Sequence, residues 1–220
     1  MVAYDVVADA YDAHFNRPVD RWEDERLTEL LRPHVDKRFV LDLGCGTGWV
    51  LDHLHPWNYV GVDASAAMLE ILRRKHPGEI TVKATIGANG WLAEVDDRWP
   101  GRIETVVSTW AAHDFGDLAL LLQDLRHHLY RGTIVALHGQ APRYKHRAHY
   151  VLDGDDEKRG YLRFTPKACE RAAFITGAHL LSCAGIGALP DRLAYSHTAW
   201  RAALAAPPRY HYSFLALWRL

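Results

Sequence analysis

Three glycines at alternate positions follow an acid and an apolar stretch in residues 40–50, which read Val-Leu-Asp-Leu-Gly-Cys-Gly-Thr-Gly-Trp-Val. Glycine accepts a positive φ and has no side chain, so Gly44, Gly46 and Gly48 predict a tight turn that a small ligand can approach closely. Asp42 precedes this turn and indicates the kind of ligand. A carboxylate repels a phosphate, whereas it attracts a cationic ligand that also carries hydroxyl groups.

A second acid, Asp63, ends the apolar stretch Tyr59–Val62, 21 residues after Asp42. If the two stretches are neighbouring strands, Asp63 lies beside the glycine turn, where its carboxylate can accept two hydrogen bonds from a ribose diol. The alternative is that Asp63 caps the following helix, but Ser65 is available for that role.

A histidine follows the fourth apolar strand, in the segment 108–115 that reads Ser-Thr-Trp-Ala-Ala-His-Asp-Phe. Ligands of open α/β sheets bind beyond the carboxyl ends of the strands, so this segment is expected in the pocket floor. His113 could take a proton from a substrate hydroxyl or amine, with Asp114 orienting its ring. The alternative is that His113 packs in the turn and that Asp114 only solvates the loop.

Metal binding is not expected, although the chain has 14 histidines. His138, His146 and His149 could cluster, but neither an HExxH motif nor a cysteine and histidine ligand spacing occurs. Three cysteines are too few and too scattered for a disulfide framework, and we expect the small Cys45 to serve the turn that contains it.

The strands and helices that must position these residues alternate along the chain. Apolar runs predict strands at 39–43, 59–62, 80–84, 103–109, 133–138, 179–183 and 212–218. Helical periodicity predicts helices at 21–31, 49–54, 65–76 and 118–129, with another that begins at Thr165-Pro166. We therefore expect an α/β fold with one doubly wound, mostly parallel sheet of about seven strands, the last antiparallel, and helices on both faces.

One domain is expected for residues 1–220, with an N-terminal helical cap in residues 1–35. Within residues 1–35, Tyr4-Asp5 recurs seven positions later as Tyr11-Asp12, and this spacing predicts that both pairs lie on one helix face. Asp20 is the expected N-cap residue of the next helix. That helix should stop before Pro33.

Two polar segments follow the predicted core. Residues 139–163 are basic and too polar for the core, which predicts a lid or insertion. Its basic residues could receive an acidic substrate or form a solvated loop. Residues 187–209 contain prolines and predict a loop with one short helix.

The charge balance argues against nucleic acid or a membrane as a partner. The formal net charge is −1, and no apolar run approaches the roughly 18 residues of a membrane span. The first residues carry acids where a secretory signal would carry Lys or Arg, so we expect a cytoplasmic protein.

These motifs resemble class I S-adenosylmethionine-dependent methyltransferases. Residues 42–48 match the first motif of that family and residues 59–63 match the second, while residues 160–220 resemble it only in element order. The rival, a nicotinamide-binding fold, has Gly-x-Gly-x-x-Gly. Here the third glycine comes two positions after the second and an acid precedes the first, which favours the methyltransferase.

The resemblance implies S-adenosylmethionine as the cofactor and an N-terminal helix that folds over it. Tyr11 would close on the methionine end, and Met68 would lie against the adenine unless it is a core residue. The third strand of the family usually ends in an acid that contacts the adenine amino group; residues 83–87 have none, so Thr85 or backbone groups would substitute. The expected cofactor-binding residues are Tyr11, Asp42, Gly44, Cys45, Gly46, Asp63, Ala64, Met68, Thr85, Ser108 and Thr109.

The function that the resemblance implies is methyl transfer to a small-molecule O, N or C nucleophile in specialised metabolism, with His113 as the catalytic base. No nucleic-acid module or basic face is present, and a monomer or homodimer is expected. Two alternatives stay open. The sulfonium could serve cyclisation or elimination that releases methylthioadenosine, or the protein could bind the cofactor without catalysis.

Overall fold

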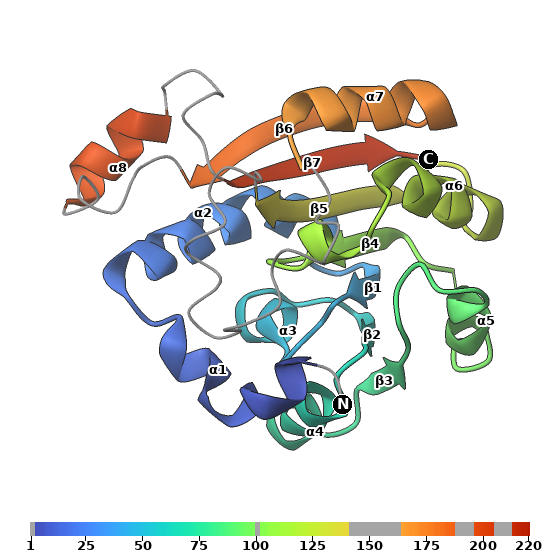
Figure 1. The fold of residues 1–220 in the computed structure, drawn as a ribbon, viewed down its shortest axis with the longest axis horizontal. Coiled ribbons are helices and arrows are strands. Elements are labelled where there is room, and N and C mark those ends of the chain that lie inside the picture. The colour runs from blue at the N-terminus through green and yellow to red at the C-terminus, as the bar shows by residue number, and fades with distance from the viewer. Residues whose placement is uncertain (1–2, 100–101, 141–163, 188–195, 205–212) are drawn as a thin grey trace.

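The strands of the chain form one sheet in the order β3-β2-β1-β4-β5-β7-β6 (Figure 1). The structure, a computed structural model, describes residues 3–99, 102–140, 164–187, 196–204 and 213–220. The strands are β1 Phe39–Leu43, β2 Asn58–Asp63, β3 Ile80–Lys83, β4 Thr105–Ser108, β5 Ile134–Gln140, β6 His179–Gly187 and β7 Ser213–Arg219. β1 to β5 pair in parallel, and β7 is antiparallel to both β5 and β6. The predicted doubly wound sheet with an antiparallel last strand is therefore confirmed.

Helices cover both faces of the sheet. The helices are η1 Ala3–Val6, α1 Ala8–His14, α2 Pro18–Val35, α3 Trp49–His53, α4 Ala66–Lys75, α5 Trp91–Asp96, η2 Ala112–Asp114, α6 Leu118–His128, α7 Pro166–Thr176 and α8 His197–Leu204. One core cluster joins α5, α6 and α7 to the strands, and a second joins α2, α3 and α4 to them. No described helix is long and apolar enough to cross a membrane.

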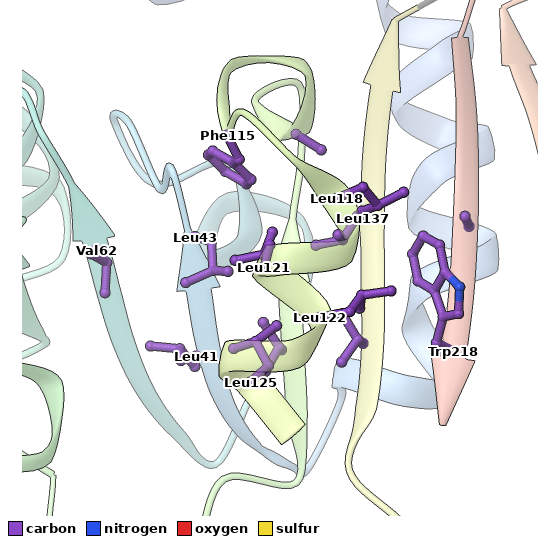
Figure 2. Packing of buried hydrophobic residues seen from close by; sticks show 14 of the residues in the cluster. Leu41, Leu43, Val62, Phe115, Leu118, Leu121, Leu122, Leu125, Leu137 and Trp218 are labelled. Carbon is purple, nitrogen blue, oxygen red and sulfur yellow. The ribbon is translucent and has the colours of Figure 1, made fainter. Parts of the chain in front are cut away.

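Helix α6 shows how sequence periodicity produces the packing. Its buried leucines recur at the spacing of one helix face: Leu118, Leu121, Leu122 and Leu125. Figure 2 shows this face directed toward Leu41 and Leu43 of β1 and Leu137 of β5, all of which belong to the same buried cluster. The helix and the central strands therefore hold each other in place.

The sheet topology puts its switch point between β1 and β4, and we call the region beyond the carboxyl ends of these two strands the crevice, because open α/β sheets have one there. The chain passes from β1 to β2 on one side, whereas β4 pairs with the other side of β1. At such a switch point the loops after the two strands diverge, and open α/β sheets bind ligands there. The carboxyl ends of β5 and β6 point to the left in Figure 1, the side on which α1 and α8 lie.

The second predicted helix is longer at both ends than expected. It begins at Pro18, and Asp20 lies in its first turn, where its carboxylate accepts the backbone N–H of Arg17 at 2.9 Å, so Asp20 is not the N-cap residue. The helix also continues through Pro33 to Val35. Pro33 is in the last turn, where the missing N–H removes one helix hydrogen bond, and burial of Leu31 and Val35 against the sheet compensates for this loss.

Three other predictions need correction. Tyr4-Asp5 and Tyr11-Asp12 do not share one helix, because η1 and α1 are separate elements. The short helix α5 was not predicted; its buried residues Trp91, Leu92 and Val95 span little more than one turn, too short for a clear period. β5 and β6 extend further than expected, to Gln140 and Gly187, because both pair with β7 along their full length.

The predicted lid lies mostly outside the described residues, which omit 141–163. Its basic residues fall in that range. Within 187–209, the expected short helix is confirmed as α8.

Candidate functional site

The glycine turn after β1 has the backbone conformation that its sequence predicts. Gly44, Gly46 and Gly48 have φ angles of 67°, 51° and 100°. A Cβ atom on Gly44 would lie 2.6 Å from the Cβ of Ala111, so the absence of a side chain lets the β1 and β4 loops pack together. A Cβ on Gly46 would meet no atom within 4 Å. The turn therefore leaves open space above the backbone of Gly46.

Asp63, at the end of β2, is fixed by backbone donors from two loops. Its Oδ2 accepts the N–H of Gly46 at 2.9 Å and its Oδ1 accepts the N–H of Ser65 at 2.8 Å. Burial raises the pKa of this carboxyl group, and the backbone donors oppose the rise. Ser65 caps α4 by accepting the N–H of Met68, as expected. Each oxygen of Asp63 retains acceptor capacity for a ligand hydroxyl.

Asp42 is completely buried behind the turn and only half satisfied. Its Oδ2 accepts the hydroxyl of Tyr59 at 2.8 Å, whereas its Oδ1 has no hydrogen-bond partner among the described residues. Burial raises the pKa of Asp42 to about 7, although the Tyr59 bond acts in the opposite direction. Tyr59 reaches Asp42 because the intervening Gly61 has no side chain; a Cβ there would lie 2.9 Å from the Tyr59 hydroxyl.

The N-terminal cap is bound to the loops that follow three strands. The hydroxyl of Tyr4 donates to Asp114 at 3.2 Å in the β4 loop, and Ser65 in the β2 loop donates its hydroxyl to Asp5 at 2.6 Å. Tyr11 lies between these contacts, with its ring centroid 6.3 Å from that of Tyr4. The cap thus spans the carboxyl edge of the sheet.

Asp12 provides the contact to the third loop. Its Oδ1 accepts the hydroxyl of Thr47 in the glycine turn at 2.5 Å, and its Oδ2 pairs with Lys75 of α4 at 3.1 Å. Lys75 also pairs with Asp52 at 2.5 Å. We call the three residues Asp12, Thr47 and Lys75 the cap clasp. It joins α1 to the turn and to α4.

A strained tryptophan follows β4 at the floor of the crevice. Trp110 has a φ of 60°, which is uncommon for a residue with a side chain. Its backbone N–H donates to Nδ1 of His138 at 3.2 Å, and the two rings meet edge to face with centroids 4.3 Å apart. Asp24 of α2 accepts the indole N–H of Trp49 at 2.8 Å. Burial raises the pKa of Asp24, and the neighbouring Trp49 and Trp110 oppose this rise.

A comparison with known protein families identifies the family of this chain. Residues 13–178 match the family model described as a methyltransferase domain. The chain belongs to this methyltransferase family. S-adenosylmethionine is therefore the cofactor of the methyltransferase, in agreement with solved relatives that depend on it. No curated protein matches the chain.

Solved structures similar to the methyltransferase share its fold at low sequence identity. A chain of the complex between the Haloferax volcanii Trm112 methyltransferase activator and a methyltransferase is 17% identical, with a TM-score of 0.67, over 99% of this chain and 95% of that chain. A methyltransferase from Archaeoglobus fulgidus is 14% identical, with a TM-score of 0.65, over 96% and 99%. The [4+2]-cyclase SpnF is 14% identical, with a TM-score of 0.64, over 98% and 93%.

The methyltransferase brings most of the predicted cofactor residues to one edge of its sheet. Asp42, Gly44, Cys45 and Gly46 follow one another at the end of β1. Asp63 and Ala64 stand at the end of β2, and Ser108 and Thr109 at the end of β4; both side chains after β4 are buried, and the hydroxyl of Ser108 has no partner among the described residues.

The positions of three other predicted residues of the methyltransferase do not identify them as site residues. Met68 is 2% exposed in α4, and Thr85, after β3, is exposed. The backbone of His113 belongs to η2, but its side chain lies outside the described part of the chain. Across the described ranges, no group of three His, Cys, Asp or Glu residues could hold a metal ion.

Four residues of this site were missed from the sequence: Asp12, Asp24, Tyr59 and His138. Asp12 and Asp24 are two of many acids in helical segments, and nothing local distinguishes them. The spacing of Tyr59 and Gly61 on a strand, with both side chains on the same face, is a signal that could have indicated the contact with Asp42.

Proposed function

We propose that this methyltransferase transfers the methyl group of S-adenosylmethionine to a nucleophilic O, N or C atom of a small molecule. The proposal is carried by three features at the carboxyl ends of β1 and β2. There the open space above Gly46 lies beside Asp63, and the buried Asp42 has an oxygen without a partner in the described structure. These features fit a cofactor that carries a ribose, an ammonium group and a sulfonium.

Different residues around the crevice would bind different parts of the cofactor. Asp63 would accept the ribose hydroxyls with its remaining lone pairs, and the free oxygen of Asp42 would face the ammonium group, directly or through water. Gly44, Cys45 and Gly46 would present bare backbone to the nucleoside and the methionine chain, with Ala64, Met68 and Thr85 near the adenine. Tyr11 would cover the methionine end, and Ser108 and Thr109 would support it from the β4 side.

The bound cofactor supplies an electrophilic methyl group, so the chain contributes mainly alignment and exclusion of water. We assign removal of the acceptor proton to His113, which follows β4 in the pocket floor. The near-neutral net charge favours a metabolite over a nucleic acid as the acceptor.

Product analysis tests this function. The protein is incubated with S-adenosylmethionine and candidate small molecules, and the cofactor products are identified by mass spectrometry. Formation of S-adenosylhomocysteine with a methylated acceptor supports the proposal, and His113→Ala should then reduce turnover without weakening cofactor binding. The absence of cofactor binding in calorimetry would contradict it.

A pair of glycine variants tests the place of the cofactor. Gly46→Ala would put a methyl group into the open space above the turn and should weaken cofactor binding at least tenfold. Gly132→Ala is the matched control, because Gly132 also has a positive φ of 95° and open space but precedes β5 at the opposite edge of the sheet. Equal affinities of the two variants would remove the glycine turn from the binding site.

A second candidate function is ring-forming or elimination chemistry in the same crevice. It is favoured by the likeness to the [4+2]-cyclase SpnF, whose fold the chain shares. The same product analysis separates the two. Release of methylthioadenosine, or an altered substrate with intact S-adenosylmethionine, would support the second function in place of methyl transfer.

A further inference from the structure

Asp24 is a carboxylate at the crevice for which the proposed function gives no role. It lies on α2 and is half-buried. Trp49 donates its indole N–H to Oδ1 of Asp24 at 2.8 Å. Trp110 is close enough to oppose the rise in pKa that burial gives Asp24. A carboxylate has about four acceptor positions, so these contacts leave room for a ligand donor. The carboxylate therefore lies near two aromatic rings with unused acceptor capacity.

The two tryptophans place Asp24 over the switch point of the sheet. Trp49 is the first residue of α3, directly after the glycine turn of β1, and Trp110 comes two residues after β4. β1 and β4 are neighbours in the sheet. Tyr11 of the cap is within electrostatic range of both Asp24 and Asp63. Asp24 thus faces the same crevice as the ribose-binding acid, on the α2 side.

Trp110, beside Asp24, is fixed by the end of β5. The backbone N–H of Trp110 donates to Nδ1 of His138, so this nitrogen carries no proton and the neutral ring has its proton on Nε2. A strained residue held by such a contact is typical of a preorganised site.

The charges around this position favour a cation. Asp12, Asp24, Asp63 and Asp114 all act on Tyr11, where their negative charges raise the pKa of its phenol together with burial. Lys75 of α4 is engaged by Asp12 and Asp52. Such a field attracts a cationic ligand and repels an anionic one.

We propose that Asp24 binds a nitrogen group of the methyl acceptor. The acceptor is then a small amine, and Asp24 is a catalytic residue beside the cofactor. The inference rests on the proposed methyl transfer. The amine enters as an ammonium ion attracted by the carboxylate, gives one proton to His113, the base assigned in the proposed function, and reacts in its neutral form. Its nitrogen lone pair forms the new N–C bond while the C–S bond of the sulfonium breaks and its electron pair stays on sulfur. The methylated nitrogen then gives one N–H proton to the carboxylate of Asp24. Burial raises the pKa of this carboxyl group, which suits a proton acceptor.

Three probes of one carbon skeleton test the inference: phenethylamine, phenethyl alcohol and phenylpropionate. Their binding to the full chain is measured by calorimetry with saturating S-adenosylhomocysteine. The wild type should bind the amine at least tenfold more tightly than the alcohol and should bind the carboxylate most weakly. Asp24→Asn should abolish the preference for the amine, whereas Glu25→Gln, an equal charge change at an exposed position of α2, should keep it.

Methyl transfer from labelled cofactor gives a second readout. Asp24→Asn should raise KM for the amine and lower kcat, with affinity for S-adenosylhomocysteine unchanged. Equal binding of the amine and the alcohol, including no binding of either, would overturn the inference, as would an amine preference that survives in Asp24→Asn.

Failure of the inference is distinguishable from failure of the proposed function. If the wild type binds S-adenosylhomocysteine but methylates the alcohol in preference to the amine, the role of Asp24 is wrong and methyl transfer stands. If the wild type does not bind S-adenosylhomocysteine at all, the proposed function itself is wrong.

Discussion

Among single residues, Asp42 is the one whose protonation we expect to respond to a cationic ligand. Its carboxyl group is fully buried, its pKa is raised to about 7, and one of its oxygens has no partner in the described structure. At neutral pH a carboxyl group with this pKa is about half protonated, because burial leaves its charged form poorly solvated. A ligand ammonium would stabilise the carboxylate and lower this pKa.

Cofactor binding should therefore release a proton below neutral pH. At about pH 6, Asp42 of the free protein is mostly protonated, and binding of S-adenosylmethionine should release close to one proton. The affinity should rise with pH up to about 7 and change little above it. Calorimetry in buffers of different ionisation enthalpy measures the release, and Asp42→Asn should remove it. Equal proton release in the variant would show that another group titrates.

Asp63 makes a different prediction, because its two oxygens are fixed by backbone donors. Asp63→Asn places an amide N–H₂ against the N–H of Gly46 or Ser65 and removes the charge that would hold the ribose. Loss of charge-assisted hydrogen bonds costs about 1.5–3 kcal/mol, so cofactor affinity should fall about ten- to hundredfold. Calorimetry checks this result, and the exposed Asp97→Asn serves as the control. An unchanged affinity would exclude Asp63 as the ribose-binding residue.

At the level of elements, the cap and the sheet edge form one unit. η1 and α1 bury little apolar surface of their own, since Ala8 is their only buried hydrophobic residue among those described. Their position depends on polar contacts to the loops after β1, β2 and β4. Elements with few buried contacts open at low free-energy cost. We therefore expect η1 and α1, though not the core-packed α2, to open for exchange of the cofactor while the sheet stays folded.

Weakening the cap clasp should accelerate cofactor release. Thr47→Val removes the hydroxyl that donates to Asp12. A hydrogen bond to a charged group contributes about 1.5 kcal/mol or more, so the dissociation rate should rise about tenfold. Stopped-flow fluorescence with S-adenosylhomocysteine measures the rate. Arg73→Gln is the control, because Arg73 bonds Thr81 instead of the cap. If both variants release the cofactor at the wild-type rate, the clasp does not control exchange.

For the whole molecule, the antiparallel strand β7 is decisive. It lies between β5 and β6 and joins the last part of the chain to the central sheet. Trp218 of β7 is completely buried in the core cluster that contains α6 and α7, and its indole N–H donates to the carbonyl of Cys169 at 3.4 Å. The stability of the site thus depends on a strand far from it in sequence.

Trp218→Ala should destabilise the protein by about 3–5 kcal/mol, the usual cost of removing a large aromatic side chain from a core. Trp57 is 69% exposed, so Trp57→Ala should change the free energy of unfolding by less than about 0.5 kcal/mol. Urea unfolding measures both. Because Trp218 does not contact the crevice, the cofactor affinity of the folded variant should be unchanged. A small effect of Trp218→Ala would mean that the C-terminal part folds independently of the sheet.

The local sequence was sufficient for the features that neighbouring residues encode. The glycine turn, the acid after β2, the parallel strands and the amphipathic α6 could all be predicted, because their signals are spacings within a few residues. The bounds of α2 and β5 were wrong where burial and pairing with distant strands overrode a local stop signal.

The hydrogen-bond and ion-pair partners of the buried and charged groups could not be predicted from the sequence. Tyr4 and Asp114 are 110 residues apart, and Asp12 and Thr47 are 35 apart. Nothing near Asp24 in the sequence distinguishes it from other acids of its helix; only the packing of α2 brings it to the indole of Trp49, on which its proposed role depends. The glycine turn and Asp63 thus identified the cofactor from sequence, whereas the acceptor side of the crevice is formed by long-range contacts that arise only when the sheet and its helices pack.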